Sequence, residues 1–314
     1  MFSSLTPWLR EQRLDFHENI AIGSWLHFKI GGKVSLLVTC NSPAQLTACL
    51  KKVIVEKIPY LLIGGGSNIV FSDGLTRAVV LLYQGTAKKT AAAKILGGRA
   101  LQVDGHVKNQ LFLSWCAAHG VGGLEFLSGI PGTMGGAAAV NAGAFGQSLA
   151  DVLLGADIVD KRGNMAAVDA GYFAFTYRGS RFKLGNEAIV SLRLKFHAEK
   201  KRVVAGKIKA NLEYRLANHP SYRLHSAGCF FKNPLIRGAK QSAGQIIETC
   251  GLKGLAVGGM SVADTHANFL IHSGGATFKE LERLEQKIKT AVKARTGISL
   301  EREVIYVSAR GEKY

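Results

Sequence analysis

Apolar residues recur in the first part of the chain at two spacings, one typical of buried strands and one typical of amphipathic helices. Val34 to Thr39 is a mostly apolar run of strand length. Ser42 to Gln45 then supply an N-cap, a proline at the first helical position and a capping-box glutamine. Apolar residues follow at helical spacing, at Leu46, Cys49, Leu50 and Val53. With short strands at 60–63 and 78–83, the pattern predicts a β-α-β unit.

The middle of the chain, from about 75 to 200, mixes the two spacings and predicts an α+β lobe. Val107 to His119 is typical of a helix. Short apolar runs predict strands at Asp157 to Val159, Met165 to Val168 and Ala188 to Leu194. The basic stretch from Lys200 to Ala217 predicts a helical connector.

The last hundred residues predict a third unit. Ser242 and Gln245 begin a short helix that Gly251 ends. Thr277 and Glu280 begin a longer helix that ends at Gly297, and its buried face is expected at Leu281, Leu284, Ile288 and Val292. A final strand is predicted at Val304 to Val307. We therefore expect three segments, at 1–75, 76–200 and 201–314.

Two glycine-rich loops lie about sixty residues apart, at Ile63 to Asn68 and Gly129 to Gly136. Glycine lets a backbone approach a ligand closely, and the exposed N–H groups then bind anionic oxygens. Two such loops predict one long phosphate-bearing ligand, a dinucleotide cofactor, although the GxGxxG spacing is absent. Each loop has a second reading. The first loop is also typical of a plain turn, and the small residues from 137 to 146 also fit tight helix packing.

Composition excludes several protein classes. The chain has 314 residues, 47% of them hydrophobic and 37 of them glycine, which indicates a folded protein of two or three domains. No CxxC spacing occurs among the five cysteines, which argues against a disulfide framework or a zinc site. No signal peptide and no apolar stretch of about twenty residues is present, so we expect a cytoplasmic protein.

The net charge of +18 favours polyanionic partners, either nucleic acid or anionic small molecules. Basic residues are spread along the chain, with short clusters only at Lys88-Lys89 and Lys200-Lys201-Arg202. Solvated surface lysines therefore explain the charge better than a dedicated nucleic-acid face does.

Two further stretches hold chemically capable side chains. Tyr177 to Arg181 places two arginines beside a glycine turn, which suits carboxylate binding, although an ordinary surface loop is the favoured interpretation of this stretch by itself. Ser226 to Pro234 places Cys229 near Lys232 and Asn233. A cysteine of this kind is often a small core residue, but a core position rarely has such polar neighbours.

These motifs together resemble a known family. They are, in order, Ile63–Asn68, Gly129–Gly146, Tyr177-Arg178-Gly179-Ser180, Ser226–Pro234, His266-Ala267-Asn268-Phe269 and Leu300-Glu301-Arg302-Glu303-Val304. From about residue 20 to 308 the chain resembles the UDP-N-acetylenolpyruvoylglucosamine reductases, flavoenzymes of bacterial cell-wall precursor synthesis. The resemblance implies an α+β fold. It consists of a two-lobed FAD-binding unit of the vanillyl-alcohol-oxidase (PCMH) type, at 1–75 and 76–200, plus an α/β substrate-binding domain at 201–314.

The resemblance also implies a reaction. NADPH reduces non-covalently bound FAD, and the hydride then passes to the enolpyruvyl double bond of a UDP-sugar, which yields UDP-N-acetylmuramate for peptidoglycan synthesis. The expected partner is this small molecule, with no nucleic acid, no membrane insertion and no metal, and the expected state is a monomer.

The family's functional residues carry over onto matching positions. Arg178 matches an arginine that stabilises charge on the substrate carboxylate, and Glu303 matches a glutamate that helps to polarise it. Cys229 stands where the family usually has the serine that donates the proton. The cofactor-binding residues implied are Gly64, Gly65, Gly66, Ser67, Asn68, Ile130, Pro131, Gly132, Thr133, Gly135, Gly136, Asn141, Ala142 and Gly143. The substrate-binding residues implied are Tyr177, Lys232 and Asn233.

Several positions depart from the family pattern. A thiol with a pKa near 8.5 is a much stronger acid than a serine hydroxyl, so Cys229 is expected to be the general acid, with activity falling at alkaline pH. Ile305 replaces a frequent arginine, and His272 replaces a frequent asparagine. The approach to the Ser226 motif also differs, at Arg215, Asn218-His219-Pro220 and Tyr222-Arg223. The chain resembles the shorter subclass, which lacks an inserted tyrosine loop.

Two other functions remain open at this point. An FAD-dependent oxidase of another small substrate would share the fold, and covalent flavin would favour it. A nucleic-acid-binding protein would explain the charge but would leave both glycine loops without a purpose.

Overall fold

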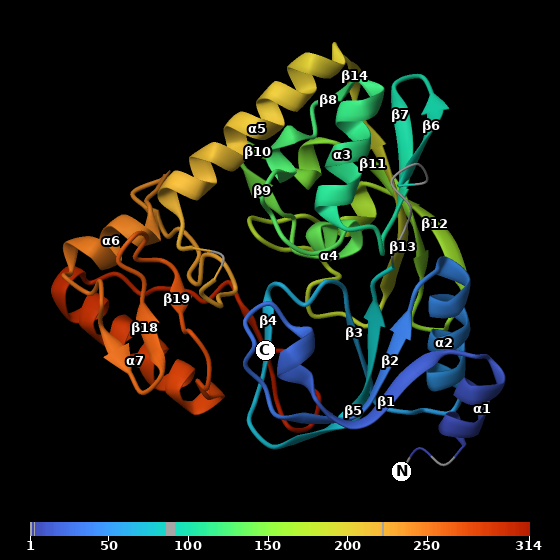
Figure 1. The fold of residues 1–314 in the computed structure, drawn as a ribbon, viewed down its shortest axis with the longest axis horizontal. Coiled ribbons are helices and arrows are strands. Elements are labelled where there is room, and N and C mark those ends of the chain that lie inside the picture. The colour runs from blue at the N-terminus through green and yellow to red at the C-terminus, as the bar shows by residue number, and fades with distance from the viewer. Residues whose placement is uncertain (1, 3, 86–91, 222) are drawn as a thin grey trace. The chain divides into compact units, whose positions relative to one another are not determined.

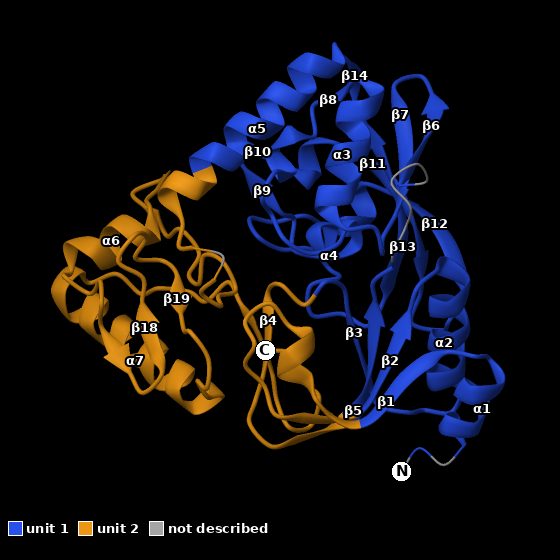
Figure 2. Cartoon of the chain, viewed as in Figure 1, with its two compact units in different colours: residues 1–18, 36–65, 78–214 blue, residues 19–35, 66–77, 215–314 orange. Residues whose placement is uncertain are grey.

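The computed structural model describes residue 2 and residues 4–85, 92–221 and 223–314, so Lys88, Lys89 and Tyr222 lie outside the described residues. The chain forms two compact units, each built from separated stretches of sequence (Figure 2). The first unit comprises residues 1–18, 36–65 and 78–214, and the second comprises 19–35, 66–77 and 215–314. The three segments expected from the sequence stay a prediction.

A four-stranded sheet carries the first glycine loop at the end of one of its strands. Its order is β1 (Asp15–Ala21), β2 (Lys33–Cys40), β5 (Leu75–Tyr83) and β3 (Tyr60–Ile63), and β3 runs parallel to β5. The helices α1 (Leu5–Glu11) and α2 (Pro43–Val55) are labelled in Figure 1. Both supply apolar residues to the same core as the sheet. The predicted strands at 34–39, 60–63 and 78–83 are confirmed, and β5 lies between β2 and β3.

The predicted start of α2 is confirmed with one change in its hydrogen bonding. The Ser42 hydroxyl accepts from the Gln45 N–H at 3.3 Å, as an N-cap does. The Gln45 side chain accepts from the N–H of Asn41, at 2.7 Å, instead of that of Ser42. The residues expected on the apolar face are buried, at Leu46, Cys49, Leu50 and Val53.

A five-stranded antiparallel sheet, in the order β12-β11-β13-β7-β6, lies within the first unit. Its strands are β12 (Met165–Asp169), β11 (Leu153–Val159), β13 (Ala188–Lys195), β7 (Ala100–Asp104) and β6 (Ala93–Gly97). The strands predicted at 157–159, 165–168 and 188–194 are confirmed with extended bounds. One face of this sheet packs with α3 (Asn109–His119) and α4 (Met134–Ala139) in a single apolar core.

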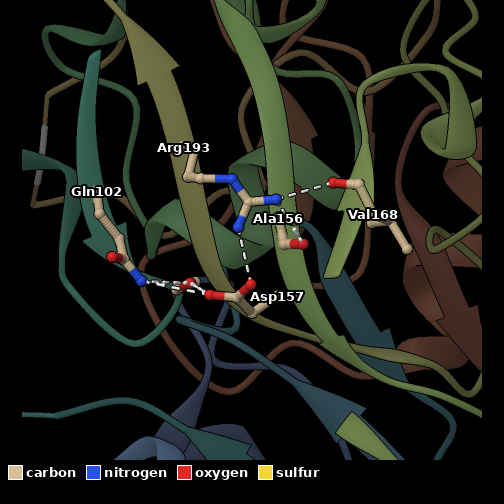
Figure 3. Close-up of polar contacts among 6 residues, drawn as sticks. Gln102, Ala156, Asp157, Val168 and Arg193 are labelled. Atoms are coloured by element: carbon tan, nitrogen blue, oxygen red, sulfur yellow. Dashed lines mark hydrogen bonds and ion pairs between the residues drawn. The ribbon is translucent and has the colours of Figure 1, made fainter. Parts of the chain in front are cut away.

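The other face of this sheet carries a polar network (Figure 3). Asp157 accepts hydrogen bonds from Arg193 at 2.8 Å and from Ser191 at 2.7 Å, and Gln102 donates to Ser191 at 3.0 Å. The Arg193 guanidinium also donates to the carbonyls of Ala156 and Val168, at 3.2 and 3.0 Å, beside an irregularity in the β11–β13 register. The Arg193 side chain therefore provides hydrogen-bond donors to carbonyls of both β11 and β12.

The second unit is built around α7 (Phe278–Thr296), whose buried face contains the residues expected from the sequence. Thr277 and Glu280 form a complete capping box, and Gly297 ends the helix with φ +74°. The helix α6 (Ala243–Thr249) begins after Ser242 and ends before Gly251, which has φ +63°. The parallel pair β4 (Ile69–Phe71) and β20 (Ile305–Val307) contains the strand predicted at 304–307.

The helix α5 (Lys201–Asn218) confirms the predicted basic helix. Among the described residues, no helix is both long enough and apolar enough to cross a membrane. The remaining strands are β8 (Val121–Gly122), β9 (Gly143–Ala144), β10 (Gln147–Ser148), β14 (His197–Ala198), β15 (Leu235–Ile236), β16 (Ala239–Lys240), β17 (Ala256–Val257), β18 (Met260–Val262) and β19 (Leu270–Ile271).

Candidate active site

The two glycine loops meet within the first unit. A Cβ atom on Gly65 would lie 2.5 Å from the Cα of Gly132, and one on Gly64 would lie 2.5 Å from the Thr133 hydroxyl oxygen. Gly65 therefore has no room for a side chain because the backbones of the two loops touch there. At Gly64 the obstacle is the Thr133 hydroxyl, which accepts from the Gly136 N–H. Gly64, Gly65, Gly132 and Gly136 stay partly exposed at this junction. We call this partly exposed junction of the two loops the seam. Because it is lined by backbone and small residues, it fits the dinucleotide that the two loops predict.

The second loop is held by hydrogen bonds to residues 105–109, which lie just before and at the start of α3. The N–H groups of Met134 and Gly135 donate to the carbonyls of Val107 and Gly105, both at 2.9 Å. Fully buried Asn109 donates to the Ile130 carbonyl at 3.1 Å. The N–H groups of Met134 and Gly135 are therefore already used to hold the loop in shape. An anion bound at this loop is expected to contact the loop's remaining polar groups. Asn109 was missed in the sequence, where the only signal is a polar residue at the start of an apolar helix.

The first loop continues into the second unit, where it reaches the segment that contains Glu303 and leads into β20 (Ile305–Val307). Gly66 has φ +62°, and its carbonyl accepts from the N–H of His27 at 3.0 Å. The carbonyl of Asn68 accepts from the N–H of Ile305 at 3.0 Å, and its side chain donates to the Glu303 carbonyl at 3.5 Å. Asn68 thus joins a predicted cofactor loop to a predicted catalytic segment.

Arg178 lies in a tight turn of the first unit. The flanking residues Thr176 and Gly179 exchange backbone hydrogen bonds of 3.0 and 3.2 Å. Arg178 has φ +58°, a left-handed conformation that costs a non-glycine residue about 1–2 kcal/mol. Such a conformation persists only where the surroundings hold it.

The turn is held by the stretch that follows the second glycine loop. The Asn141 side chain donates to the Thr176 carbonyl at 2.9 Å and accepts from the N–H of Ala150 at 3.0 Å. The Ser180 hydroxyl donates to the Ala139 carbonyl at 2.7 Å. Asn141, predicted as a cofactor-binding residue, therefore also positions the turn of Tyr177 and Arg178.

Cys229 and Glu303 lie on neighbouring extended segments of the second unit. The Glu303 N–H donates to the Phe230 carbonyl at 2.8 Å, and the Lys232 N–H donates to the Glu301 carbonyl at 2.8 Å. On the other edge, Cys229 pairs with Phe269 in an isolated β-bridge. Both predicted catalytic residues are partly exposed, whereas the rings of Phe230 and Phe231 are buried.

Lys232 and Asn233 have structural contacts here. Lys232 forms an ion pair with Glu301, and the Asn233 side chain accepts from the N–H of Ala243, the first residue of α6, at 3.0 Å. Their roles in substrate binding stay a prediction.

His272 and Ile305, two departures from the family pattern, are buried. Nδ1 of His272 accepts from the Gly274 N–H at 3.1 Å, so Nε2 carries the proton and donates to the Phe28 carbonyl at 2.6 Å. Burial lowers the pKa of His272. His272 is thus a neutral residue that ties two backbone segments together.

Two further histidines, His219 and His266, lie against Phe269, the bridge partner of Cys229. The ring centroids of His219 and His266 are 4.9 and 5.0 Å from that of Phe269. Burial, together with the charges of Arg215 and His266, lowers the pKa of His219 to about 4. Both rings are therefore expected to be neutral near pH 7.

Comparisons with known proteins agree with this arrangement. The model of an FAD binding domain matches residues 34–169, which include both glycine loops. The model of the UDP-N-acetylenolpyruvoylglucosamine reductase C-terminal domain matches residues 219–307, which include Cys229 and Glu303. The chain therefore combines an FAD-binding domain with a reductase-type domain.

Curated relatives match over most of the chain. UDP-N-acetylenolpyruvoylglucosamine reductase of Geobacter metallireducens is 37% identical, over 88% of this chain and 88% of that protein. The enzyme of Borreliella burgdorferi is 32% identical, over 91% and 92%. The crystal structure of UDP-N-acetylenolpyruvylglucosamine reductase from Thermus caldophilus superposes with a TM-score of 0.74 at 27% identity, covering 94% of this chain and 98% of that one. The chain belongs to the UDP-N-acetylenolpyruvoylglucosamine reductase family, an FAD-binding family of oxidoreductases.

Proposed function

We propose that this protein reduces UDP-N-acetylglucosamine enolpyruvate to UDP-N-acetylmuramate in peptidoglycan precursor synthesis, with NADPH as the reductant. Family membership over most of the chain supports the substrate and the reaction. The observation that carries the assignment of the catalytic residues is the pairing of the Cys229 and Glu303 segments through the 2.8 Å hydrogen bond from Glu303 to Phe230. Monomeric state and cytoplasmic location stay predictions.

The seam between the two glycine loops fits FAD, which when bound would supply hydride transfer to the terminal carbon of the enolpyruvyl double bond. It would be held by residues 64–68, 130–133, 135–136 and 141–143. Negative charge then builds on the substrate carboxylate, and Arg178 supplies a fixed cation to stabilise it. Glu303 assists by hydrogen bonding to the same carboxylate, a role that requires the glutamate in its protonated form.

Cys229 completes the reduction by donating the thiol proton to the carbon that carries the ether oxygen. The thiol becomes a thiolate and regains its proton from solvent before the next turnover. A thiol titrates near pH 8.5 when its surroundings do not shift it, so the donor is present at neutral pH and is lost as the pH rises. Activity is expected to fall on the alkaline side for this reason.

The first test is an absorption spectrum of the purified protein, followed by anaerobic addition of NADPH and then of UDP-N-acetylglucosamine enolpyruvate. The expected protein is yellow, bleaches with NADPH and regains its colour with the enolpyruvyl sugar. Bleaching without recovery would keep the flavin fold and remove this substrate, which favours an oxidase of another small molecule. A colourless protein that takes up no added FAD would remove both.

The proton donor has its own test in two variants. Cys229→Ala is expected to abolish turnover of the enolpyruvyl sugar while flavin reduction by NADPH continues, because hydride transfer to FAD does not need the thiol. Cys229→Ser is expected to remain active and to lose the alkaline decline, since a serine hydroxyl does not titrate in this range. Unchanged turnover and an unchanged pH profile in Cys229→Ser would show that the thiol has no special role.

A further inference from the structure

The side-chain amide of Asn268 forms the two hydrogen bonds to Phe231 that the backbone of a neighbouring β-strand would otherwise form. Its Oδ1 accepts from the N–H of Phe231 and its Nδ2 donates to the carbonyl of the same residue, both at 2.8 Å. Its backbone carbonyl accepts from the N–H of Phe230 at 2.7 Å. With 2% of its surface exposed, Asn268 is shielded from competing water.

The same two residues are held on their other edge by the segment that contains Glu303. Phe230 accepts from the Glu303 N–H, and Phe231 pairs with Arg302 in an isolated β-bridge. Both phenylalanine rings are 1% exposed. The peptide groups directly after Cys229 are therefore fixed from both sides, with Asn268 supplying the bonds on one of them.

We propose that Asn268 is a positioning residue for Cys229, holding the thiol where it donates its proton. The purpose of this positioning, proton donation by Cys229, rests on the proposed function. The hydrogen bonds by which Asn268 holds the segment after Cys229 do not depend on that function. Asn268 acts through Phe230 and Phe231 and is not itself assigned to the chemistry.

The site demands an amide for a simple reason. Phe231 presents one donor and one acceptor, and a neutral side chain with one acceptor and one donor satisfies both. A carboxylate at 268 would satisfy the N–H but would face the Phe231 carbonyl with a second oxygen. An apolar side chain would leave both groups buried without partners.

The cysteines of this chain make the positioning measurable. All five lie in the described residues, and Cys40, Cys49, Cys116 and Cys250 are between 0% and 3% exposed. Cys229 is partly exposed. A pyridyl disulfide reagent is attacked by a thiolate, forms a mixed disulfide and releases a coloured thiopyridone. One fast equivalent of release is expected from the folded wild type, and Cys229→Ser should remove it.

The test compares Asn268→Ala and Asn268→Asp with the wild type, each loaded with FAD and checked for folding by circular dichroism. Loosening of the segment is expected to raise the fast rate at Cys229 by at least about threefold, because local opening exposes the thiol. The kcat for the enolpyruvyl sugar is expected to fall by about 10–100-fold with little change in KM, since misplacement of a reacting group acts on the chemical step. An unchanged fast rate in folded Asn268→Ala would overturn the inference.

The aspartate variant adds a reversible test. Burial raises the pKa of a carboxyl group, and the protonated form again offers one donor and one acceptor to Phe231. The ratio of the variant's fast rate to that of the wild type at the same pH is therefore expected to approach one as the pH is lowered from 8 to 5. A ratio above one that does not depend on pH would argue against this pairing.

The matched control is Asn211→Asp on α5, which makes the same amide-to-carboxylate change where Asn211 donates to the Glu125 carbonyl at 2.9 Å. It should leave the fast rate at Cys229 unchanged. If neither variant at 268 folds, amide hydrogen exchange of the wild type decides. Protection of the Phe230 and Phe231 amides comparable to that of α7 supports the inference, and fast exchange overturns it.

The outcomes separate the inference from the proposed function. Loss of turnover in Cys229→Ala together with unchanged thiol reactivity in the 268 variants would remove the positioning role and keep the catalytic one. Altered reactivity together with an active Cys229→Ala would keep the positioning role and remove the proton donor.

Discussion

Glu285 illustrates how a single buried charge organises the residues around Glu303. It is 5% exposed and accepts from the Tyr306 hydroxyl at 2.8 Å, from Arg302 at 3.2 Å and from Lys289 at 2.6 Å. The Arg302 guanidinium lies 3.5 Å from the centroid of the Tyr306 ring. The sequence indicated the catalytic motif at 300–304 but contained no signal for this network, because α7 and β20 meet only in the folded chain.

Removing one partner of this network is expected to destabilise the protein. Tyr306→Phe keeps the ring and loses one hydrogen bond to a charged group, which should lower the free energy of unfolding by about 1.5–3 kcal/mol. Glu285→Ala leaves a guanidinium and an ammonium without their anion and should cost about 3–5 kcal/mol. Urea denaturation measures both changes.

The control for this prediction is Lys209→Ala, which breaks the exposed ion pair of Lys209 with Glu213. Exposed pairs contribute little, so its midpoint should match the wild type within error. Equal effects of Glu285→Ala and Lys209→Ala would contradict the assigned importance of burial.

At the scale of elements, the sequence predicted helices correctly where the capping residues lie within the helix's own first turn. It missed elements that exist only through pairing with another strand. Ser42 and Thr277 marked their helices to the residue, because the capping bonds form between residues three apart. The strands β4, β6 and β7 were not predicted. They are only three to five residues long and exist through pairing with β20, β13 and each other. The short helix α4 was likewise hidden within a run of glycine and alanine.

The contact between the two glycine loops gives an element-scale prediction. Gly65→Ala places a methyl group 2.5 Å from the Gly132 backbone, so the loops must separate. We expect weaker FAD binding and a lower melting temperature, measured by flavin titration and thermal unfolding.

Gly206→Ala in α5 is the matched control, because its Cβ would meet nothing within 4 Å among the described residues. It should raise stability by about 0.5–1 kcal/mol through helix propensity and leave FAD binding intact. Full flavin occupancy with unchanged affinity in Gly65→Ala would show that the seam tolerates the separation.

At the scale of the whole molecule, charge and burial of histidine govern the response to pH. The surplus of +18 is consistent with capture of anionic ligands, as expected for the proposed cofactor and substrate. Burial is the main cause that lowers the pKa of His106, His219, His266 and His272, whose side chains are expected to stay neutral in the folded state. The unfolded chain takes up protons below pH 6.5, whereas the folded chain takes them up only at lower pH.

Stability is therefore expected to fall as the pH is lowered from about 6.5 toward 4, the window set by His219. His219→Asn should make the unfolding free energy depend less on pH in this window. The substitution removes a group that becomes protonated at a higher pH in the unfolded state than in the folded state. Unfolding free energies at pH 4, 5, 6 and 7 for both proteins measure the effect. Parallel curves would show that other groups cause the acid sensitivity.

The sequence alone determined the α+β class, the main helices and most of the longer strands, the family and the FAD-binding domain. These follow from local hydrophobic spacing, from capping residues a few positions apart and from ordered motifs. Tertiary structure decided which groups those motifs meet. Asn268 pairs with a peptide 37 positions away, and the Asn68 side chain meets a carbonyl 235 positions away. Hydrogen bonds of this kind depend on backbone groups that every residue shares, so the identity of a distant partner leaves no trace in the local pattern and appears only when the chain has folded.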